Sequence, residues 1–130
     1  MDIISIIKEL PEMKFSGPVD EEEVSKAENE LNLVFAKDYK EYLLNFGFAY
    51  SDVIAISGII DDEAFNVVDL TKKFKPIYKN IPSDFYVIED VGVDGLVIWQ
   101  DSLGVIYQSI PNHDPVKIFD NLSDFLKEQI

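Results

Sequence analysis

Cysteine and arginine are both absent from this 130-residue sequence. Without cysteine the chain has no disulfide, no thiol nucleophile and no thiolate ligand for zinc. Without arginine the basic residues are all lysines, eleven in number, and they are opposed by 25 acidic residues, for a formal net charge of -14. Proteins gain much of their affinity for nucleic acids by placing cations on phosphates, so we expect no direct binding of DNA or RNA.

Long hydrophobic runs are also missing. No stretch approaches the roughly 20 apolar residues that a transmembrane helix needs. The apolar run 3–7 near the N-terminus is short, is interrupted by Ser5 and follows an acidic residue, which is not the pattern of a signal peptide. Hydrophobic residues nevertheless make up 47% of the chain. We therefore expect one globular domain over residues 1–130, without a membrane partner and located in the cytoplasm.

The excess of acidic residues has two interpretations. Negative charge keeps proteins soluble, and it also attracts basic partners and accelerates their association. The charge alone does not decide between these two roles.

Three β-rich segments, 85–89, 96–100 and 105–108, are separated by turn residues and predict consecutive antiparallel strands. Asp101 and Gly104 are placed as a type I turn prefers, and Gly92 and Gly95 flank Asp94 in the other connection. Segments 53–56 and 58–60 predict two short strands or a hairpin, followed by an acidic turn at residues 61–63. A last strand is expected over residues 116–119.

Apolar residues at helical spacing predict several helices that begin at capping residues. The expected helices are a short one after Asp2 that is ended by Pro11, one over 20–31, one over 36–46, one from Asn66 towards Asn80 with Leu70, Phe74, Ile77 and Tyr78 buried, and one after Asn121 with Leu122, Phe125, Leu126 and Ile130 on one face. Residues 14–18 are expected to be a connector. The fold class is therefore α+β, with a central, largely antiparallel sheet and helices packed on it.

Asp90, Asp94 and Asp101 are the candidate acid-base residues, because they bracket the central hairpin. Asp94 and Asp101 lie at opposite ends of one strand and so roughly 16 Å apart, too far for a carboxylate pair. Asp90 and Asp94 share one end, where turn chemistry explains both equally well. A calcium loop lacks ligands at the apolar positions 96–99, and the single histidine, His113, lies in a proline-flanked turn. No catalytic residue, metal or cofactor is expected.

Two stretches carry a resemblance to a known family. The first is residues 27–47, AENELNLVFAKDYKEYLLNFG, which is similar to the helix, break and helix of the SMI1/KNR4 (SUKH) superfamily. The second is residues 85–111, FYVIEDVGVDGLVIWQDSLGVIYQSIP, which is similar to the strand, glycine loop, strand, turn and strand of the same superfamily. The resemblance implies an α+β domain. In bacteria it most often implies an immunity protein that sequesters a cognate polymorphic or contact-dependent toxin, frequently a nuclease. The family has no common catalytic motif.

The resemblance and the charge together suggest that an acidic surface binds a toxin with a basic face. The residues expected to form the partner-binding surface are Asp61, Asp62, Glu63, Glu89, Asp90 and Asp94, with Tyr86 or Trp99 as aromatic anchors. Packing in the core is the favoured alternative for Trp99. Two other functions stay open: an intracellular scaffold or regulatory adaptor with the same fold, and a small hydrolase that depends on Asp90 or Asp94.

Overall fold

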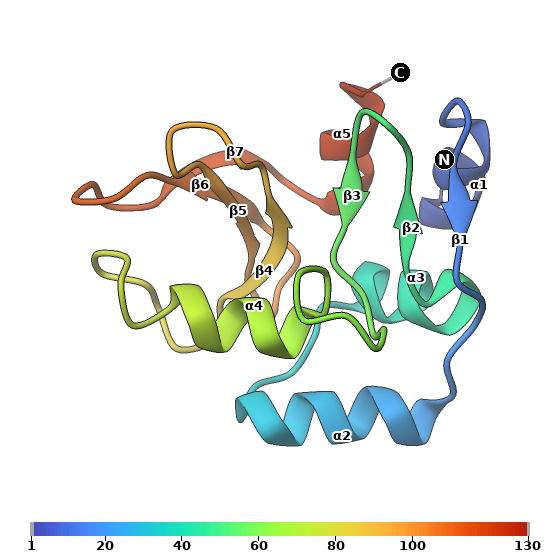
Figure 1. Ribbon diagram of the computed structural model, residues 1–130, viewed down its shortest axis with the longest axis horizontal. Helices are drawn as coiled ribbons and strands as arrows, with labels where there is room; N and C mark the ends of the chain where they lie inside the picture. The colour runs from blue at the N-terminus through green and yellow to red at the C-terminus, as the bar shows by residue number, and fades with distance from the viewer. Residues whose placement is uncertain (1, 130) are drawn as a thin grey trace.

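Helices and two antiparallel sheets make up the computed structural model, which describes residues 2–129 (Figure 1). The fold is α+β, as predicted. The helices within the described residues are α1 (Ile3–Glu9), α2 (Glu21–Leu31), α3 (Lys37–Phe46), α4 (Val67–Phe74) and α5 (Leu122–Lys127). The strands are β1 (Lys14–Phe15), β2 (Ala49–Tyr50), β3 (Ala55–Ile56), β4 (Tyr86–Asp90), β5 (Val97–Gln100), β6 (Ile106–Ser109) and β7 (Val116–Phe119).

The predicted capping residues begin four of the helices. The side chains of Asp2, Asp20, Asn66 and Asn121 each accept hydrogen bonds from backbone N–H groups of the first turn, at α1, α2, α4 and α5. Such a bond satisfies one of the N–H groups that a helix start otherwise leaves unpaired. Helix α3 differs, because its cap position is Ala36, which offers no side-chain acceptor.

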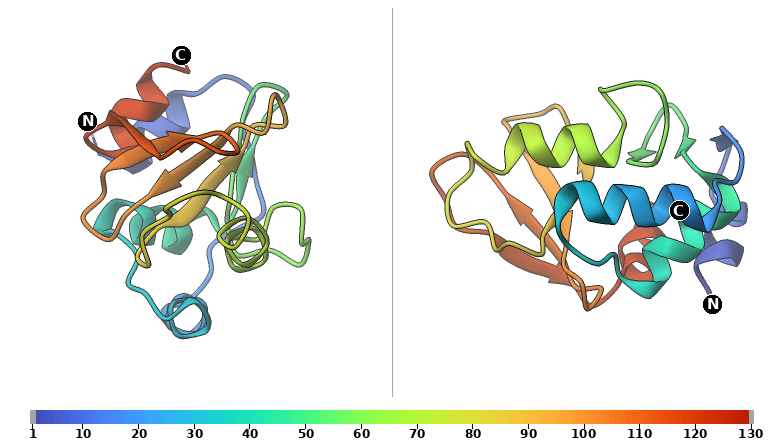
Figure 2. Two further views of the ribbon diagram at one scale, coloured as in Figure 1. Left: turned by 90° about the vertical axis from the view of Figure 1, so that its left-hand side faces the viewer. Right: turned by 90° about the horizontal axis from the view of Figure 1, so that it is seen from below.

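The four-stranded sheet is the predicted meander. Its order is β4-β5-β6-β7, every pair is antiparallel, and a bulge interrupts the β4–β5 register between Val87 and Glu89. Side chains of successive residues point to opposite faces of a strand, so an apolar strand can be buried on both sides. Val87 and Trp99 pack against α4, whereas Tyr86, Ile88 and Ile98 pack into the larger core with α1, α3 and α5. Two helical layers thus enclose this sheet (Figure 2).

The second sheet is smaller and has the order β1-β2-β3. Ser57 directly follows β3, and its backbone N–H donates to the carbonyl of Ile88 in β4 of the larger sheet at 2.7 Å. The backbone segments at its base lie very close together, because a Cβ at Gly58 would overlap the carbonyl oxygen of Gly47. Helices α1, α3 and α5 lie on one side of the three strands, and no helix of residues 2–129 lies on the other side (Figures 1 and 2).

Several predictions about this region are wrong. Of the two strands predicted over 53–56 and 58–60, only the first forms, as β3; it pairs with β2, a strand that the sequence did not indicate, so the 53–60 hairpin does not form. The expected connector 14–18 contains β1. Helix α4 ends at Phe74 rather than near Asn80, and Ile77 is 66% exposed rather than buried. The expected contact of Ile130 lies outside the described residues.

Candidate functional site

Most carboxylates of the described chain are not neutralised by a neighbouring cation. The ion pairs within residues 2–129 are Lys40–Glu28, Lys72–Glu30, Lys117–Asp120 and Lys127–Asp124. The last two join residues three apart on the surface, where such pairs contribute little. The negative charge of the sequence is therefore also a property of the folded surface.

The lysines at the end of α4 are only partly free in solution. Lys72 pairs with Glu30, and the ammonium of Lys73 lies 5.0 Å from the centre of the Phe74 ring. Lys75 donates to the carbonyl of Ser83 at 2.7 Å, and burial lowers its pKa although nearby Asp84 raises it. These cations stabilise the fold locally rather than forming one anion-binding patch.

The acidic segment 61–63 is a turn, as predicted, and its shape is fixed by Asp62. The Asp62 side chain accepts from the N–H of Ala64 at 3.0 Å, and its carbonyl accepts from the N–H groups of Phe65 and Asn66. Asp61 and Glu63 are exposed, and none of the hydrogen bonds or ion pairs within residues 2–129 uses their side chains. These two carboxylates are available to a partner.

Glu89, Asp90 and Asp94 form a second acidic group at the end of β4 and in the turn that follows. The Asp90 side chain accepts from the N–H of Gly92 at 3.2 Å, and Asp94 adopts a positive φ of 54°. Both are therefore turn residues. The predicted acids therefore belong to two segments, the turn before α4 and the end of β4 with the turn that follows it.

Glu89 differs from its neighbours because it is partly buried. Burial raises its pKa to about 7, against the opposing effect of a hydrogen bond from the backbone of Ala55, and the charge of Asp90 raises it further. Glu89 is therefore protonated more often near neutral pH than an exposed glutamate is. This residue adds less negative charge to the surface than the formal count assigns to it.

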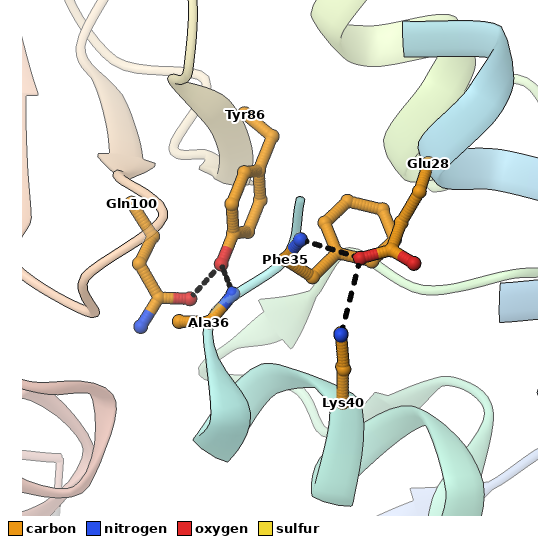
Figure 3. Close-up of polar contacts among 6 residues, drawn as sticks. All are labelled: Glu28, Phe35, Ala36, Lys40, Tyr86 and Gln100. Carbon is orange, nitrogen blue, oxygen red and sulfur yellow. Dashed lines mark hydrogen bonds and ion pairs between the residues drawn. The ribbon is translucent and has the colours of Figure 1, made fainter. Parts of the chain in front are cut away.

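The expected aromatic anchors are wrong for the folded chain. Tyr86 and Trp99 are both 0% exposed, so neither ring can reach a partner. The Tyr86 hydroxyl accepts from the N–H of Ala36 at 2.9 Å and donates to Oε1 of Gln100 at 2.6 Å (Figure 3). Burial holds the Tyr86 pKa well above its usual value, which keeps the hydroxyl protonated. The Trp99 indole N–H donates to Ser109 within the α4 side of the sheet.

A carboxylate that the sequence did not single out fixes the link between α2 and α3. Glu28 accepts from the N–H of Phe35 at 2.8 Å and lies 3.4 Å from the ammonium of Lys40 (Figure 3). Phe35 then packs edge-on against the rings of Tyr39 and Tyr86. Together with the Tyr86–Ala36 hydrogen bond, this contact attaches the helical layer to the sheet, so its role is structural.

The described residues contain no group of three histidine, cysteine, aspartate or glutamate side chains placed to hold a metal ion. Asp101, one of the candidate acids, is buried and organises its own turn. Its carboxylate accepts from the N–H groups of Leu103 and Val105 and from the Tyr107 hydroxyl. These bonds account for Asp101 without catalysis.

Two of the open cavities are lined by carboxylates and by lysine. One, of about 390 Å³, lies where α1, α3 and α5 begin, and includes Asp38, Glu41 and Lys127. The other, of about 480 Å³, is a groove beside β1 and β2 lined by Glu12, Met13, Lys14, Tyr50, Ser51 and Asp52. We call the second the β1–β2 groove. Its exposed aromatic residue, Tyr50, was not singled out in the sequence, although Phe48 and Tyr50 show the two-residue alternation of a strand.

A bilayer-spanning helix would have to be longer and more apolar than any helix formed by residues 2–129. A comparison with protein-family models matches residues 2–130 to the family described as SMI1-KNR4 cell-wall, of the SUKH type. The match spans both stretches that carried the resemblance in the sequence. A search of curated proteins gave no match.

Proposed function

The chain belongs to the SMI1/KNR4 (SUKH) family, and on this premise we propose that it is an immunity protein that binds a cognate toxin and neutralises it by sequestration. Members of the family are commonly immunity proteins. The observation that carries the proposal is the family match over residues 2–130. The toxin is a polymorphic or contact-dependent toxin with a basic surface, and a nuclease is the class that suits the charge best.

The charge of the chain supports a basic partner. A nuclease must place cations on the phosphates of its substrate, and those cations are what an acidic protein can cover. Opposite charges on the two proteins also accelerate their encounter, which matters for an inhibitor that must reach the toxin before the toxin reaches its substrate. Binding over the substrate cleft would suffice for inhibition, so the proposal needs no catalytic residue in this chain.

The exposed carboxylates are the proposed contact residues. Asp61 and Glu63 project from the first acidic group, and Asp90 and Asp94 belong to the second. Asp62 contributes charge while it holds its turn, and Glu89 contributes only the fraction of charge that its raised pKa leaves at neutral pH. Tyr86 and Trp99 are not part of the proposed surface.

A pull-down from the native host tests this function. The tagged chain is used as bait, the captured proteins are washed at low and then at high salt, and each fraction is identified by mass spectrometry. We expect one protein in stoichiometric amount, with a basic domain, that is released as the salt concentration rises. Recovery of several housekeeping proteins instead would overturn the proposal in favour of an adaptor.

A further inference from the structure

The three-stranded sheet exposes one face that no helix of the described chain covers. Phe15 and Ala49 are paired across β1 and β2 and point to the covered side, where Phe15 stacks on Phe46 of α3 at 4.7 Å. Because side chains alternate along a strand, Lys14 and Tyr50 point to the other side. We call this uncovered side the outer face.

The outer face carries a row of aromatic rings. Phe48 lies between Tyr50 and Phe65, with ring centres 5.3 Å and 5.2 Å away. Tyr50 is 40% exposed and Phe65 is 38% exposed, whereas Phe48 is buried beneath them. Val53, at the tip of the β2–β3 turn, is 78% exposed. These exposed apolar side chains are few, as in the central part of a protein interface rather than in a whole interface.

Acidic residues flank this row at both ends. At the Phe65 end, Asp61, Asp62 and Glu63 belong to the turn whose central carbonyl binds the Phe65 N–H. At the Tyr50 end, Glu12 and Asp52 line the β1–β2 groove. None of these five carboxylates takes part in the ion pairs found within residues 2–129. The groove also holds one cation, Lys14.

This combination indicates the chemistry of the occupant. An apolar centre with an acidic rim is complementary to a protein segment that presents an apolar side chain between lysines or arginines. Phosphates and anionic membranes would be repelled. A second copy of this chain would bring the same carboxylates face to face, which is costly.

We propose that the outer face, with the aromatic row at its centre and the β1–β2 groove at one end, is the docking surface for a cationic, apolar-containing segment of a partner protein. The assignment of that partner as the toxin rests on the function proposed above. Tyr50 and Phe65 are the central contacts, and residues 61–63 with Glu12 and Asp52 form the charged rim.

A defined peptide probe tests the surface without the toxin. The ¹⁵N-labelled full chain is titrated at 0.15 M salt with the peptide Lys-Lys-Leu-Lys-Lys-Leu-Lys-Lys and, as a control, with the same peptide carrying serine in place of leucine. At this ionic strength charges beyond about 8 Å are largely screened, so the effects report nearby residues. We expect chemical-shift changes at residues 12–15, 48–53 and 61–65, and weaker binding of the serine peptide.

Matched variants make the test specific. The double variants Asp61→Lys/Glu63→Lys and Glu12→Lys/Asp52→Lys are each expected to weaken binding of the leucine peptide about tenfold, since two attractions become repulsions. Tyr50→Thr, which replaces the ring with a β-branched residue that strands favour, is expected to weaken binding of the leucine peptide by about threefold to tenfold. Asp114→Lys/Asp120→Lys carries the same charge change at the two ends of β7 in the other sheet, and Leu103→Ser removes an 88% exposed apolar side chain elsewhere. Both controls should stay within about twofold of the parent.

The outcomes separate the surface from the function. Unchanged binding in Tyr50→Thr, or an equal loss in Asp114→Lys/Asp120→Lys, would overturn the outer face as the docking surface. Each variant is first checked for folding by circular dichroism. The same variants are then used as bait in the pull-down. If all outer-face variants still retain the toxin, the proposed docking surface is wrong and the proposed immunity function stands. If the peptide binds the outer face but no toxin is captured, the docking surface stands and the immunity function is wrong.

Discussion

Removing the Tyr86 hydroxyl tests whether this residue is an internal link rather than a partner contact. In Tyr86→Phe the ring keeps its place between Phe35 and Tyr39, but the buried N–H of Ala36 loses its acceptor and Gln100 loses one donor. An unsatisfied buried N–H costs about 1–3 kcal/mol, and Gln100 still donates its own N–H groups to Asp38 and Gly104. We expect the free energy of unfolding to fall by about 2–3 kcal/mol.

The assay is urea unfolding followed by circular dichroism, with Tyr107→Phe as the matched control. The Tyr107 hydroxyl is only partly buried and donates to Asp101, whose carboxylate keeps two backbone N–H partners. Tyr107→Phe should lower the free energy of unfolding by about 1 kcal/mol or less. A loss below about 0.5 kcal/mol in Tyr86→Phe, or a loss no larger than that of the control, would refute the reasoning. Peptide binding should be unchanged in Tyr86→Phe, because the ring is buried.

Three further predictions concern stability. Glu89→Gln should raise the free energy of unfolding by about 1–2 kcal/mol at pH 8 and leave it unchanged near pH 4. This value is smaller than the full pKa difference implies, because the side chain is only partly buried. The sign follows because the pKa in the folded chain, about 7, exceeds the value of 4.5 for an unperturbed glutamate, so the parent loses stability as the pH rises from about 4.5 through 7. Urea midpoints of parent and variant from pH 4 to 8 measure this difference, and a gap that does not change with pH would contradict it. Gly58→Ala should lower the free energy of unfolding by about 2 kcal/mol or more, because its methyl group would overlap the Gly47 carbonyl. Gly92→Ala, with nothing near its Cβ position but a φ of +78°, should show the smaller loss caused by backbone strain without an overlap. Glu28→Ala should lower the free energy of unfolding by about 1–2 kcal/mol, because it removes the acceptor of the Phe35 N–H. Glu30→Ala loses only an exposed ion pair and should lower it by less than about 0.5 kcal/mol in the same thermal or urea unfolding experiment.

The elements that the sequence predicted correctly are those whose signals are local. Helices α1, α2, α4 and α5 begin at the expected capping residues, because an N-cap acts on N–H groups two or three residues away. The strands β4, β5 and β6 were visible because each contains β-branched and aromatic residues and turn residues separate them.

The errors come from contacts between segments far apart in the sequence. Strands β1, β2 and β3 are two residues each, too short for a periodic pattern, and they form because backbone groups around Gly17, Gly47 and Gly58 meet. The burial of Tyr86 is likewise decided by its distant partner Ala36, fifty positions away. The outer face could not be found in advance, since a sequence does not show which sheet face the helices leave uncovered.

Neutralisation of the captured partner tests the central claim most directly. The basic protein recovered from the pull-down is expressed from an inducible promoter in a bacterial host, alone and together with this chain, and viable cells are counted after induction. The immunity function predicts that the partner alone kills the cells and that co-expression restores growth, with partial loss of protection in Asp61→Lys/Glu63→Lys. A partner that is harmless alone, or cells that die equally with and without this chain, would contradict the account.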